Sequence, residues 1–300
     1  MTIPFISLKD MDRRLNWGEI TTAIAEGHKL PKADVKDSFV YRGGDTLLTR
    51  DAWIDGLGIA VKAATVFPEN PSKGESSING GVMLLDNDTG ILKAVIDFHL
   101  ITKWKTAGDS LLAAKTLARP DSDKILIVGA GTVAQSMIEA YRSHWPKADI
   151  RVWNRTKHLA EDLGLPVMDD LGEAVHWADI ICTATMASDP IIKGEWLRPG
   201  QHLDLIGAYR PDMREVDDAT LTRAALFVDS RDTTIGHIGE IKDPMERGAL
   251  KPEDILADYY DLDSGRFCRR HDAEITICKN GGGAHMDLMV ADAIYRKWKG

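Results

Sequence analysis

Ile125-Leu-Ile-Val-Gly129-Ala-Gly131-Thr132-Val133-Ala134 is the stretch that decides the fold. A short apolar run meets a Gly-x-Gly-x-x-Ala pattern, and helix-spaced apolar residues follow, as expected for a strand, a tight turn and a helix. Gly129 permits the turn, Gly131 lets the backbone approach a pyrophosphate, and Ala134 is small enough for the helix to pack on the strand. The first amides of the helix would bind the phosphates. The stretch therefore predicts a dinucleotide-binding unit, although glycine-rich strand ends also occur in sheets that bind nothing.

The second strand of such a unit is expected about twenty residues after the glycine turn. A strand-like run lies there and ends in Val152-Trp153-Asn154-Arg155-Thr156. NAD-binding folds place an acid at this strand end to bind the ribose 2′-hydroxyl, and this chain has none. Asn154 and Thr156 can donate hydrogen bonds, and Arg155 can pair with a 2′-phosphate. The triplet favours NADP(H) over NAD(H), unless Arg155 is only a solvated loop charge.

Strand-like and helix-like segments alternate through the middle of the chain. Further strands are predicted at residues 150–153, 179–184, 201–206, 226–229 and 275–278. This alternation predicts an α/β fold with a parallel, doubly wound sheet of the Rossmann type. The loop Thr183-Ala-Thr185 comes where a loop commonly packs over the cofactor, which makes Thr185 a candidate contact. The Lys/Glu-rich segment Glu240–Asp254 is interpreted as a solvated helical face.

The first third of the chain has a different pattern. Short β-rich runs, separated by Gly, Asp and Pro, occur at residues 38–41, 58–67, 82–85 and 91–96. Asp86-Asn-Asp-Thr-Gly90 between two of these runs is typical of a β-hairpin. A long helix is predicted from Thr102 to Ala118. We therefore expect an antiparallel α+β domain over residues 1–110, ahead of the α/β domain over residues 111–285.

Composition and charge exclude several classes of function. With 46 acidic against 37 basic residues the net charge is −9, whereas a nucleic-acid-binding protein needs a basic surface that displaces counterions. No apolar run approaches the ~18 residues needed to span a bilayer, and the first residues lack the pattern of a signal peptide. The three cysteines are odd in number and lack metal-site spacing. We therefore expect no metal centre, no nucleic-acid or membrane partner, and a reducing, cytoplasmic compartment.

Several stretches, taken in their order along the chain, carry a resemblance to a known family. They are Gly58-Ile-Ala-Val-Lys62 with Phe67-Pro-Glu-Asn70, Leu100-Ile-Thr-Lys-Trp-Lys105-Thr106-Ala107, Gly129-Ala-Gly131, Ala178-Asp-Ile-Ile-Cys-Thr-Ala-Thr185, Gly207-Ala-Tyr-Arg-Pro-Asp-Met-Arg-Glu215 and Lys279-Asn-Gly-Gly-Gly-Ala-His-Met-Asp287. No single stretch suffices, but in this order they resemble the ornithine cyclodeaminase/mu-crystallin family. The resemblance implies a substrate-binding and dimerisation domain, residues 1–110 completed by a last helix at 286–300, and a Rossmann NAD(P)-binding domain at 111–285.

The resemblance also implies which residues bind a substrate carboxylate. Family members act on substrates that carry a carboxylate beside a C–N centre. The lysine of their Gly-x-x-Val-Lys strand binds that carboxylate, and it matches Lys62. Without the motif, Lys62 would be interpreted as a solvated strand lysine. Where the family has Arg-Thr-Ala-Ala on a helix, this chain has Lys105-Thr106-Ala107-Gly108. Lys105 keeps the positive charge of the arginine but cannot make the two parallel hydrogen bonds of a guanidinium to a carboxylate. Thr106 would lie near the cofactor phosphates. Arg42 is either a third carboxylate contact, matching an upstream arginine of the family, or a surface charge.

One departure from the family pattern bears on the reaction. Cyclodeaminases carry an aspartate in a Gly-x-Asp motif where this chain has Gly207-Ala-Tyr209. A phenol, with an ordinary pKa of about 10, is a poor general base near neutral pH. Reduction of a preformed imine asks less of the protein, which must hold the ring, bind the carboxylate and exclude water. Tyr209 would then either hydrogen-bond the imine nitrogen or line the pocket.

Two further features near the end of the chain are candidates for the site. The run Gly281-Gly282-Gly283 either allows close approach to a nicotinamide, with Gly282 as the contact, or is a plain flexible turn. His285 faces either the nicotinamide or solvent. It titrates near neutral pH, so it could relay a proton to the product amine, or it could start the last helix without any chemistry.

These inferences lead to one favoured function and three alternatives. We expect an NADPH-dependent oxidoreductase of C–N bonds that reduces a cyclic imino acid, either Δ1-pyrroline-2-carboxylate to proline or Δ1-piperideine-2-carboxylate to pipecolate. The alternatives are an NAD-dependent ornithine cyclodeaminase that releases ammonia, an amino-acid dehydrogenase, and an NADPH-gated binding protein with negligible turnover. A homodimer is implied by the family resemblance alone.

Overall fold

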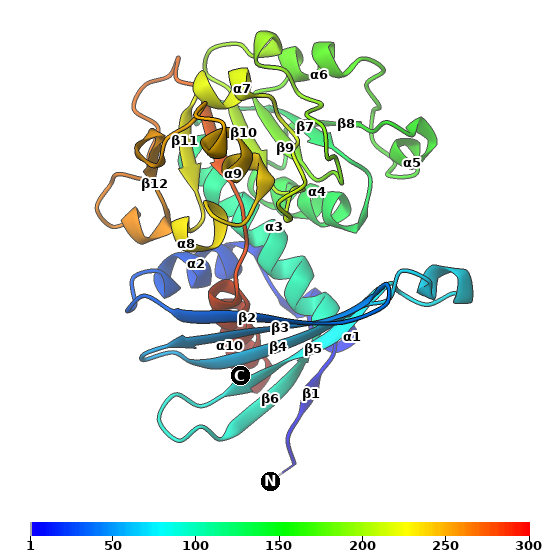
Figure 1. Ribbon diagram of the computed structural model, residues 1–300, viewed down its shortest axis with the longest axis vertical. Coiled ribbons are helices and arrows are strands. Elements are labelled where there is room, and N and C mark those ends of the chain that lie inside the picture. Colours follow the sequence, from blue (N-terminus) through cyan, green and yellow to red (C-terminus); the bar gives the residue numbers. More distant parts are fainter. Residues whose placement is uncertain (1) are drawn as a thin grey trace. The chain divides into compact units, whose positions relative to one another are not determined.

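The computed structural model describes residues 2–300, and these divide into two compact units (Figure 1). Unit 1 contains the residues up to Lys105 together with Gly283–Gly300, and unit 2 contains Thr106–Gly282. The chain passes from unit 1 to unit 2 inside helix α3 (Phe98–Leu117) and returns at the glycine run before helix α10 (Ala284–Lys299).

Unit 1 is built on a six-stranded mixed sheet. The strands lie in the order β1-β6-β5-β4-β3-β2, in which β1 and β6 are parallel and the other neighbours antiparallel. Their bounds are β1 (Phe5–Ile6), β2 (Asp34–Arg42), β3 (Asp45–Ile54), β4 (Gly58–Val66), β5 (Ile78–Leu85) and β6 (Leu92–Asp97). The predicted hairpin turn joins β5 to β6, where the Asp86 carboxylate accepts hydrogen bonds from the backbone N–H groups of Asp88 and Thr89. The expected α+β architecture is confirmed, but the sheet is mixed rather than wholly antiparallel, because β1 pairs in parallel with β6.

Helix α10 covers one face of this sheet. It packs against β3, β4 and β5 and against helix α2 (Trp17–Gly27). Side chains alternate between the two faces of a strand, and the buried positions of β4 are Gly58, Ala60, Lys62 and Ala64. The small residues on either side of Lys62 let the helix lie close to the strand. The other helical segments of unit 1 are α1 (Leu8–Met11), η1 (Asp12–Arg14) and η2 (Asn70–Lys73).

Unit 2 is built on a seven-stranded parallel sheet in the order β12-β11-β13-β10-β9-β7-β8. Its strands are β7 (Lys124–Val128), β8 (Asp149–Trp153), β9 (Ile180–Thr183), β10 (His202–Leu205), β11 (Ala225–Val228), β12 (Ile255–Ala257) and β13 (Thr276–Lys279). The order reverses at β7, because the chain first adds β8 on one side and then β9 on the other. Ligands of open α/β sheets bind at the carboxyl ends of strands at such a reversal. The predicted doubly wound Rossmann-type fold is confirmed.

The four central strands β9, β10, β11 and β13 are buried along their whole length. They are buried because helical segments pack on the sheet, as expected of parallel strands. The helical segments of unit 2 are α4 (Thr132–His144), α5 (Lys157–Glu161), α6 (Leu171–Trp177), η3 (Gly194–Trp196), α7 (Asp218–Thr222), α8 (Arg231–Thr234), α9 (Gly239–Glu246), η4 (Pro252–Asp254) and η5 (Tyr259–Asp261). The interpretation of Glu240–Asp254 as a solvated face was wrong at its start, since Glu240 and Ile241 are buried.

Three properties of residues 2–300 bear on the membrane, metal and redox predictions. None of their helices is both long and apolar enough to cross a membrane. No three His, Cys, Asp or Glu side chains in this part of the chain are grouped so that they could hold a metal ion. The cysteines are free thiols, of which Cys182 and Cys278 are buried and Cys268 is partly buried. The cytoplasmic location stays a prediction.

Candidate active site

Two buried lysines meet one buried carboxylate in unit 1. The Lys62 ammonium lies 3.0 Å from the Asp287 carboxylate, and the Lys105 ammonium lies 4.0 Å from the same oxygen. Asp287 is only 1% exposed. The three side chains come from β4, from α3 and from the first turn of α10, so they are brought together in unit 1 by elements far apart in the sequence. We call Lys62, Lys105 and Asp287 the lysine–aspartate cluster.

Burial acts against the charges of this cluster, and the neighbouring charges partly restore them. Burial, with Lys105 and Arg50 acting in the same direction, lowers the pKa of Lys62 to about 8, although Asp287 opposes the shift. Burial raises the pKa of Asp287, but Lys62, Lys105 and Arg50 outweigh it and hold that pKa below its ordinary value. Lys62, Lys105 and Arg50 thus lie near Asp287, and Arg50 also pairs with a second carboxylate on β2, which leaves one positive charge in excess. Such a group is complementary to an anionic ligand, and a carboxylate is the simplest one.

Arg50 is a neighbour of Lys62 that the sequence interpretation missed. The two residues lie directly opposite each other on the antiparallel strands β3 and β4, so their side chains share one face of the sheet. Arg50 also pairs with Asp37 of β2 at 3.0 Å and is partly exposed. β3 was not among the predicted strands, so no particular residue was expected opposite Lys62.

Arg42, the arginine that the sequence did suggest, is not brought into the cluster in unit 1. Its register on β2 places it on the sheet face opposite to Lys62, because Tyr41 and not Arg42 is in register with Thr46 and Val66. The Arg42 side chain is 81% exposed and pairs with Asp45 at 2.9 Å. Of the two alternatives stated for Arg42, the surface charge describes its surroundings in unit 1.

His285 lies in unit 1 and does not face solvent. It is buried, and its ring meets the edge of the His28 ring with the centroids 5.2 Å apart. Burial, together with the nearby His28 and Lys105, holds the pKa of His285 well below its ordinary value. The neutral imidazole is therefore favoured at neutral pH, and a proton relay through His285 stays a prediction.

The predicted strand–turn–helix is present in unit 2 between β7 and α4. Gly129 has φ +123°, and a Cβ atom there would lie 2.6 Å from the carbonyl oxygen of Ala184, so only glycine fits. A Cβ atom on Gly131 would meet nothing within 4 Å. Gly131 and Thr132 are exposed and Val133 is partly buried, and within residues 2–300 no side chain caps the first amides of α4. Open space in front of uncapped helix amides fits the pyrophosphate of a dinucleotide.

The loop after β8 presents a free arginine. The Asn154 side-chain amide donates to the carbonyl oxygen of Thr156 at 2.8 Å, which shapes the turn. Arg155 and Thr156 are exposed, and the Arg155 guanidinium makes no hydrogen bond or ion pair with any other residue from 2 to 300. An unpaired guanidinium at this strand end fits a 2′-phosphate, whereas the Asn154 amide is already partly used.

A buried glutamate that the sequence interpretation missed fastens two loops at the carboxyl edge of the sheet. The Glu215 carboxylate accepts hydrogen bonds from the hydroxyls of Thr183 and Thr185 and from the backbone N–H groups of Thr185, Gly207 and Ala208. The predicted cofactor contact Thr185 therefore has its hydroxyl engaged inside the protein. Glu215 lay in a quoted motif, but its spacing gave no sign that it is fully buried.

Asp229 plays the same part for the glycine run after β13. Its carboxylate accepts the backbone N–H of Gly282 at 2.6 Å and the hydroxyl of Thr234 at 2.8 Å. Gly282 is buried with φ +67°, a conformation that favours glycine. The candidate Gly282 is thus a fixed turn whose N–H is already used. Thr106 is half-buried in α3.

Tyr209 lies on the surface of unit 2. Its side chain is 53% exposed, and the Arg210 guanidinium lies over its ring at 5.6 Å. Asp212 is also exposed and pairs with Arg210 at 2.9 Å. The two roles stated for Tyr209 both stay predictions.

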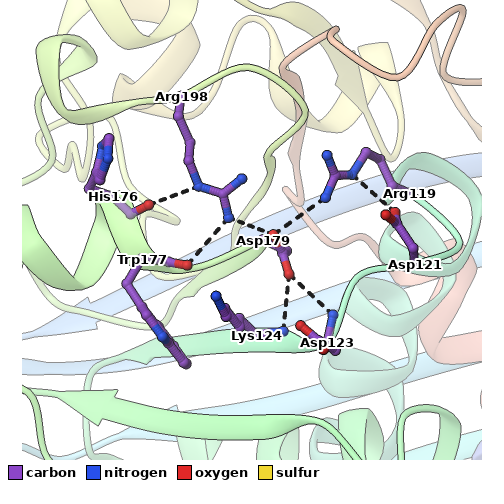
Figure 2. Close-up of a pocket in the computed structure, with 8 residues that line it drawn as sticks. All are labelled: Arg119, Asp121, Asp123, Lys124, His176, Trp177, Asp179 and Arg198. Atoms are coloured by element: carbon purple, nitrogen blue, oxygen red, sulfur yellow. Dashed lines mark hydrogen bonds and ion pairs between the residues drawn. The ribbon is translucent and has the colours of Figure 1, made fainter.

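A hollow of about 540 Å³ lies at the opposite edge of the unit 2 sheet (Figure 2). It is lined at the amino ends of β7 and β9, far along the strands from the glycine turn. Its charges neutralise one another: Arg198 lies 2.5 Å and Arg119 3.5 Å from Asp179, which also accepts the backbone N–H groups of Asp123 and Lys124. Because these charges are already paired, we assign no ligand to this hollow.

Fold and site together define a class of protein: an α/β chain with a Rossmann-type unit and a second unit that buries an excess of cations. The chain belongs to the ornithine cyclodeaminase/mu-crystallin family, which it matches over residues 52–300. The resemblance inferred from the sequence is confirmed.

Three similar proteins illustrate the range of this fold. A Δ1-pyrroline-2-carboxylate reductase of Paracoccus denitrificans is 47% identical over 307 residues, covering 99% of this chain and 97% of that protein. The Thermococcus litoralis Δ1-pyrroline-2-carboxylate reductase, solved in complex with NADH and L-proline, has a TM-score of 0.88 and 27% identity, covering 98% and 97% of the two chains. An archaeal alanine dehydrogenase dimer with bound NAD has a TM-score of 0.90 and 26% identity, covering 99% and 96%.

Proposed function

We propose that this protein is an NADPH-dependent oxidoreductase of C–N bonds that reduces a cyclic imino acid. The substrate we favour is Δ1-pyrroline-2-carboxylate, reduced to proline, with Δ1-piperideine-2-carboxylate, reduced to pipecolate, as the six-membered equivalent. The observation that carries the proposal is the buried excess of cations around Asp287, in a chain whose other unit has a dinucleotide-type turn. The relative that is 47% identical is named for this reaction, which supports the choice.

The residues of unit 1 have a simple task in this reaction. The Lys62 and Lys105 ammonium groups bind the substrate carboxylate, and Arg50 adds a third positive charge from the strand beside Lys62. Charge-assisted bonds of this kind orient a small ring as well as hold it. The bound cofactor supplies a hydride to the imine carbon. A cyclodeaminase is less well supported, because Tyr209 replaces the aspartate on which that reaction depends.

The proposed preference for NADPH rests on the loop after β8. Because Arg155 is exposed and unpaired among residues 2–300, it is free to pair with a 2′-phosphate. Arg155→Ala should raise the KM for NADPH about tenfold, which corresponds to ~1.4 kcal/mol, and leave the KM for NADH unchanged. Lys147→Ala, an exposed lysine of unit 2, is the matched control. Equal effects of Arg155→Ala on both cofactors would remove the argument.

We also infer that two copies of the chain pair through unit 1. The sheet face opposite to Lys62 exposes four large apolar side chains, Val40, Leu47, Trp53 and Met83. Exposed apolar patches of this kind mark interaction surfaces. The similar alanine dehydrogenase is described as a dimer, which favours a second copy as the partner. Trp53→Lys should convert a dimer into monomers in light scattering. A wild-type protein that is monomeric would contradict the inference.

The test of the function is a turnover assay with purified protein. NADPH and Δ1-pyrroline-2-carboxylate are mixed with the protein, the loss of NADPH absorbance is followed, and proline is identified as the product. NADH is run in parallel. Turnover that is faster with NADPH supports both the reaction and the cofactor preference. Absence of turnover with both cofactors would contradict the function, and ammonia release from ornithine with NAD would replace it with the cyclodeaminase.

A further inference from the structure

We propose that Asp287 recognises the nitrogen of the substrate: its free carboxylate oxygen, Oδ2, accepts the N–H of the protonated imine, while Oδ1 holds Lys62. The inference rests on the proposed function and adds the group that distinguishes an imino acid from other small carboxylates. It gives one residue of the lysine–aspartate cluster a direct contact with the reacting C=N bond.

The two oxygens of Asp287 have different surroundings. Oδ1 lies 3.0 Å from the Lys62 ammonium and 4.0 Å from the Lys105 ammonium. Oδ2 is buried and has no hydrogen-bond partner among residues 2–300. A buried acceptor left without a donor destabilises the folded state, and more so when it is charged. Native proteins rarely carry such an atom without a reason, and here it lies beside cations suited to bind the substrate.

The cluster holds this oxygen in a fixed direction. Asp287 lies in the first turn of α10, where the positive end of the helix dipole favours a negative charge. The Lys62 ammonium donates a hydrogen bond to Oδ1, and it lies 4.8 Å from the centre of the Phe98 ring. A carboxylate held on one oxygen by a buried lysine cannot turn without breaking that ion pair. Oδ2 is therefore a pre-oriented acceptor.

The chemistry of the substrate matches a lysine and an aspartate side by side. In a 2-carboxylate of a cyclic imine the carboxylate and the nitrogen are attached to the same carbon. A protein that binds both must place a cation for the carboxylate next to an acceptor for the N–H. Lys62 and Asp287, 3.0 Å apart, meet this requirement. A 2-keto acid offers no N–H, so the Asp287 contact selects the imine.

The contact also agrees with the electron and proton balance of the reduction. Hydride adds to the imine carbon, the π pair of the C=N bond moves onto nitrogen, and the nitrogen keeps the proton that it already carries. Asp287 thus donates no proton, and its role is to stabilise the protonated imine that accepts the hydride. The neutral amine formed in this step then takes a proton from water.

The test compares two ligands that differ only in the nitrogen. L-Proline carries a ring ammonium beside its carboxylate, and cyclopentanecarboxylate has a methylene in that place. Binding of each is measured by calorimetry on the protein loaded with NADP⁺. Asp287→Asn should weaken proline binding by about tenfold or more, as loss of a charged hydrogen bond does. Cyclopentanecarboxylate should bind as well as before or more tightly, because a negative charge beside its carboxylate has been removed.

Asp292→Asn is the matched control. Asp292 is a second buried aspartate of α10, but its partner is Arg296, at 2.5 Å. This variant should change the affinity for neither ligand. Asp287→Glu keeps the charge, so it should retain more of the preference for proline than Asp287→Asn does.

Three outcomes would overturn the inference. One is an equal loss of affinity for both ligands in Asp287→Asn, because Asp287 would then act only through the lysines. Another is unchanged proline binding. Where the variants do not fold, the wild-type protein decides: it should bind proline at least about tenfold more tightly than cyclopentanecarboxylate, and equal affinities contradict the proposal. A wild-type protein that binds proline with this preference but shows no imine reduction would contradict the proposed function and leave the Asp287 contact supported.

Discussion

The two units bury charge in opposite ways. Unit 1 places three cations, Lys62, Lys105 and Arg50, near the buried carboxylate of Asp287. Unit 2 buries mainly acids, inside its parallel sheet and in the segments that follow the strands, together with the cations Lys279 and Arg214. Four acidic residues of this unit have no exposed surface: Asp204, Glu215, Asp229 and Glu240.

The difference lies in how the buried charge is compensated. In unit 2 the donors are backbone N–H groups and hydroxyls: Glu215 accepts from five of them, and Glu240 accepts from the N–H groups of Glu215 and Val216. Those carboxylates hold the protein's own loops together. In unit 1 the three cations have two carboxylate partners, Asp287 and the Asp37 that pairs with Arg50, so one positive charge is left over, as expected of a site that binds an anion. Removing a charge should therefore cost activity in unit 1 and stability in unit 2.

The largest effect is expected from Lys62→Met, which removes the central cation and keeps the bulk. We expect kcat/KM for the imino acid to fall by about two orders of magnitude or more, because a buried charged contact to the substrate is worth about 2–5 kcal/mol. Steady-state kinetics with Δ1-pyrroline-2-carboxylate measures this. Lys73→Met, at an exposed position of unit 1, is the control. An unchanged kcat/KM in Lys62→Met would contradict the claim that the buried cations of unit 1 bind the substrate.

Glu215→Gln tests the other half of the comparison. All five groups that surround the Glu215 carboxylate are donors, so the amide NH₂ of glutamine would face further donors. We expect a loss of about 2–3 kcal/mol of stability, because buried donors are left unpaired, and a lower Tm by ~5–10 °C. Thermal unfolding followed by circular dichroism measures it, with the exposed Glu195→Gln as control. A Tm equal to that of the wild type would show that Glu215 is not an anchor.

The pH dependence of carboxylate binding sharpens the comparison further. Burial lowers the pKa of Lys62 to about 8, so Lys62 loses its proton as the pH rises through that value. Affinity for cyclopentanecarboxylate should be full below about pH 8 and fall above it. In Lys62→Arg the fall should move to higher pH, because a guanidinium stays charged. Calorimetric titrations at a series of pH values measure both. An identical pH profile in the two proteins would exclude Lys62 as the group that titrates.

The smallest effect is expected from Asp204→Asn in unit 2. Burial raises the pKa of Asp204 to about 7, although hydrogen bonds from the Ser110 and Tyr141 hydroxyls oppose the shift. A raised pKa in the folded state means that stability is present at low pH and is lost as the pH rises through about 7. The asparagine oxygen can accept both bonds without the charge. Its Tm should therefore fall less between acid and mildly alkaline pH, and a steeper fall than in the wild type would contradict this.

The sequence could predict the parts of the site that are local. The glycine turn and the loop with Arg155 each depend on residues that are close along the chain, so spacing and residue type were sufficient. The parallel sheet pairs distant strands, but the alternation of strands and helices along the chain predicts it. Lys62 and Lys105 were identified because they lie in motifs of the family. The family resemblance, rather than periodicity, therefore supplied the carboxylate-binding role that is proposed for them.

The remaining parts depend on contacts between distant residues. Asp287 meets Lys62 only because α10 packs on β4, and Arg50 replaces Arg42 beside Lys62 only because of the strand register. A shift by one residue exchanges the two faces of a strand, and the sequence alone did not fix that register. The burial of Glu215 and Glu240 was also not predicted, because glutamates are usually exposed. Most of the hydrogen bonds to these two carboxylates come from backbone N–H groups, which no sequence pattern identifies.

The measurement that tests the central claim most directly is a crystal structure of the protein with NADP⁺ and L-proline. We predict that the proline carboxylate lies within hydrogen-bond distance of the Lys62 and Lys105 ammonium groups, with its nitrogen toward Asp287. Proline bound elsewhere, with Lys62 and Asp287 still paired only to each other, would contradict the claim that the buried positive charge of unit 1 is the substrate site.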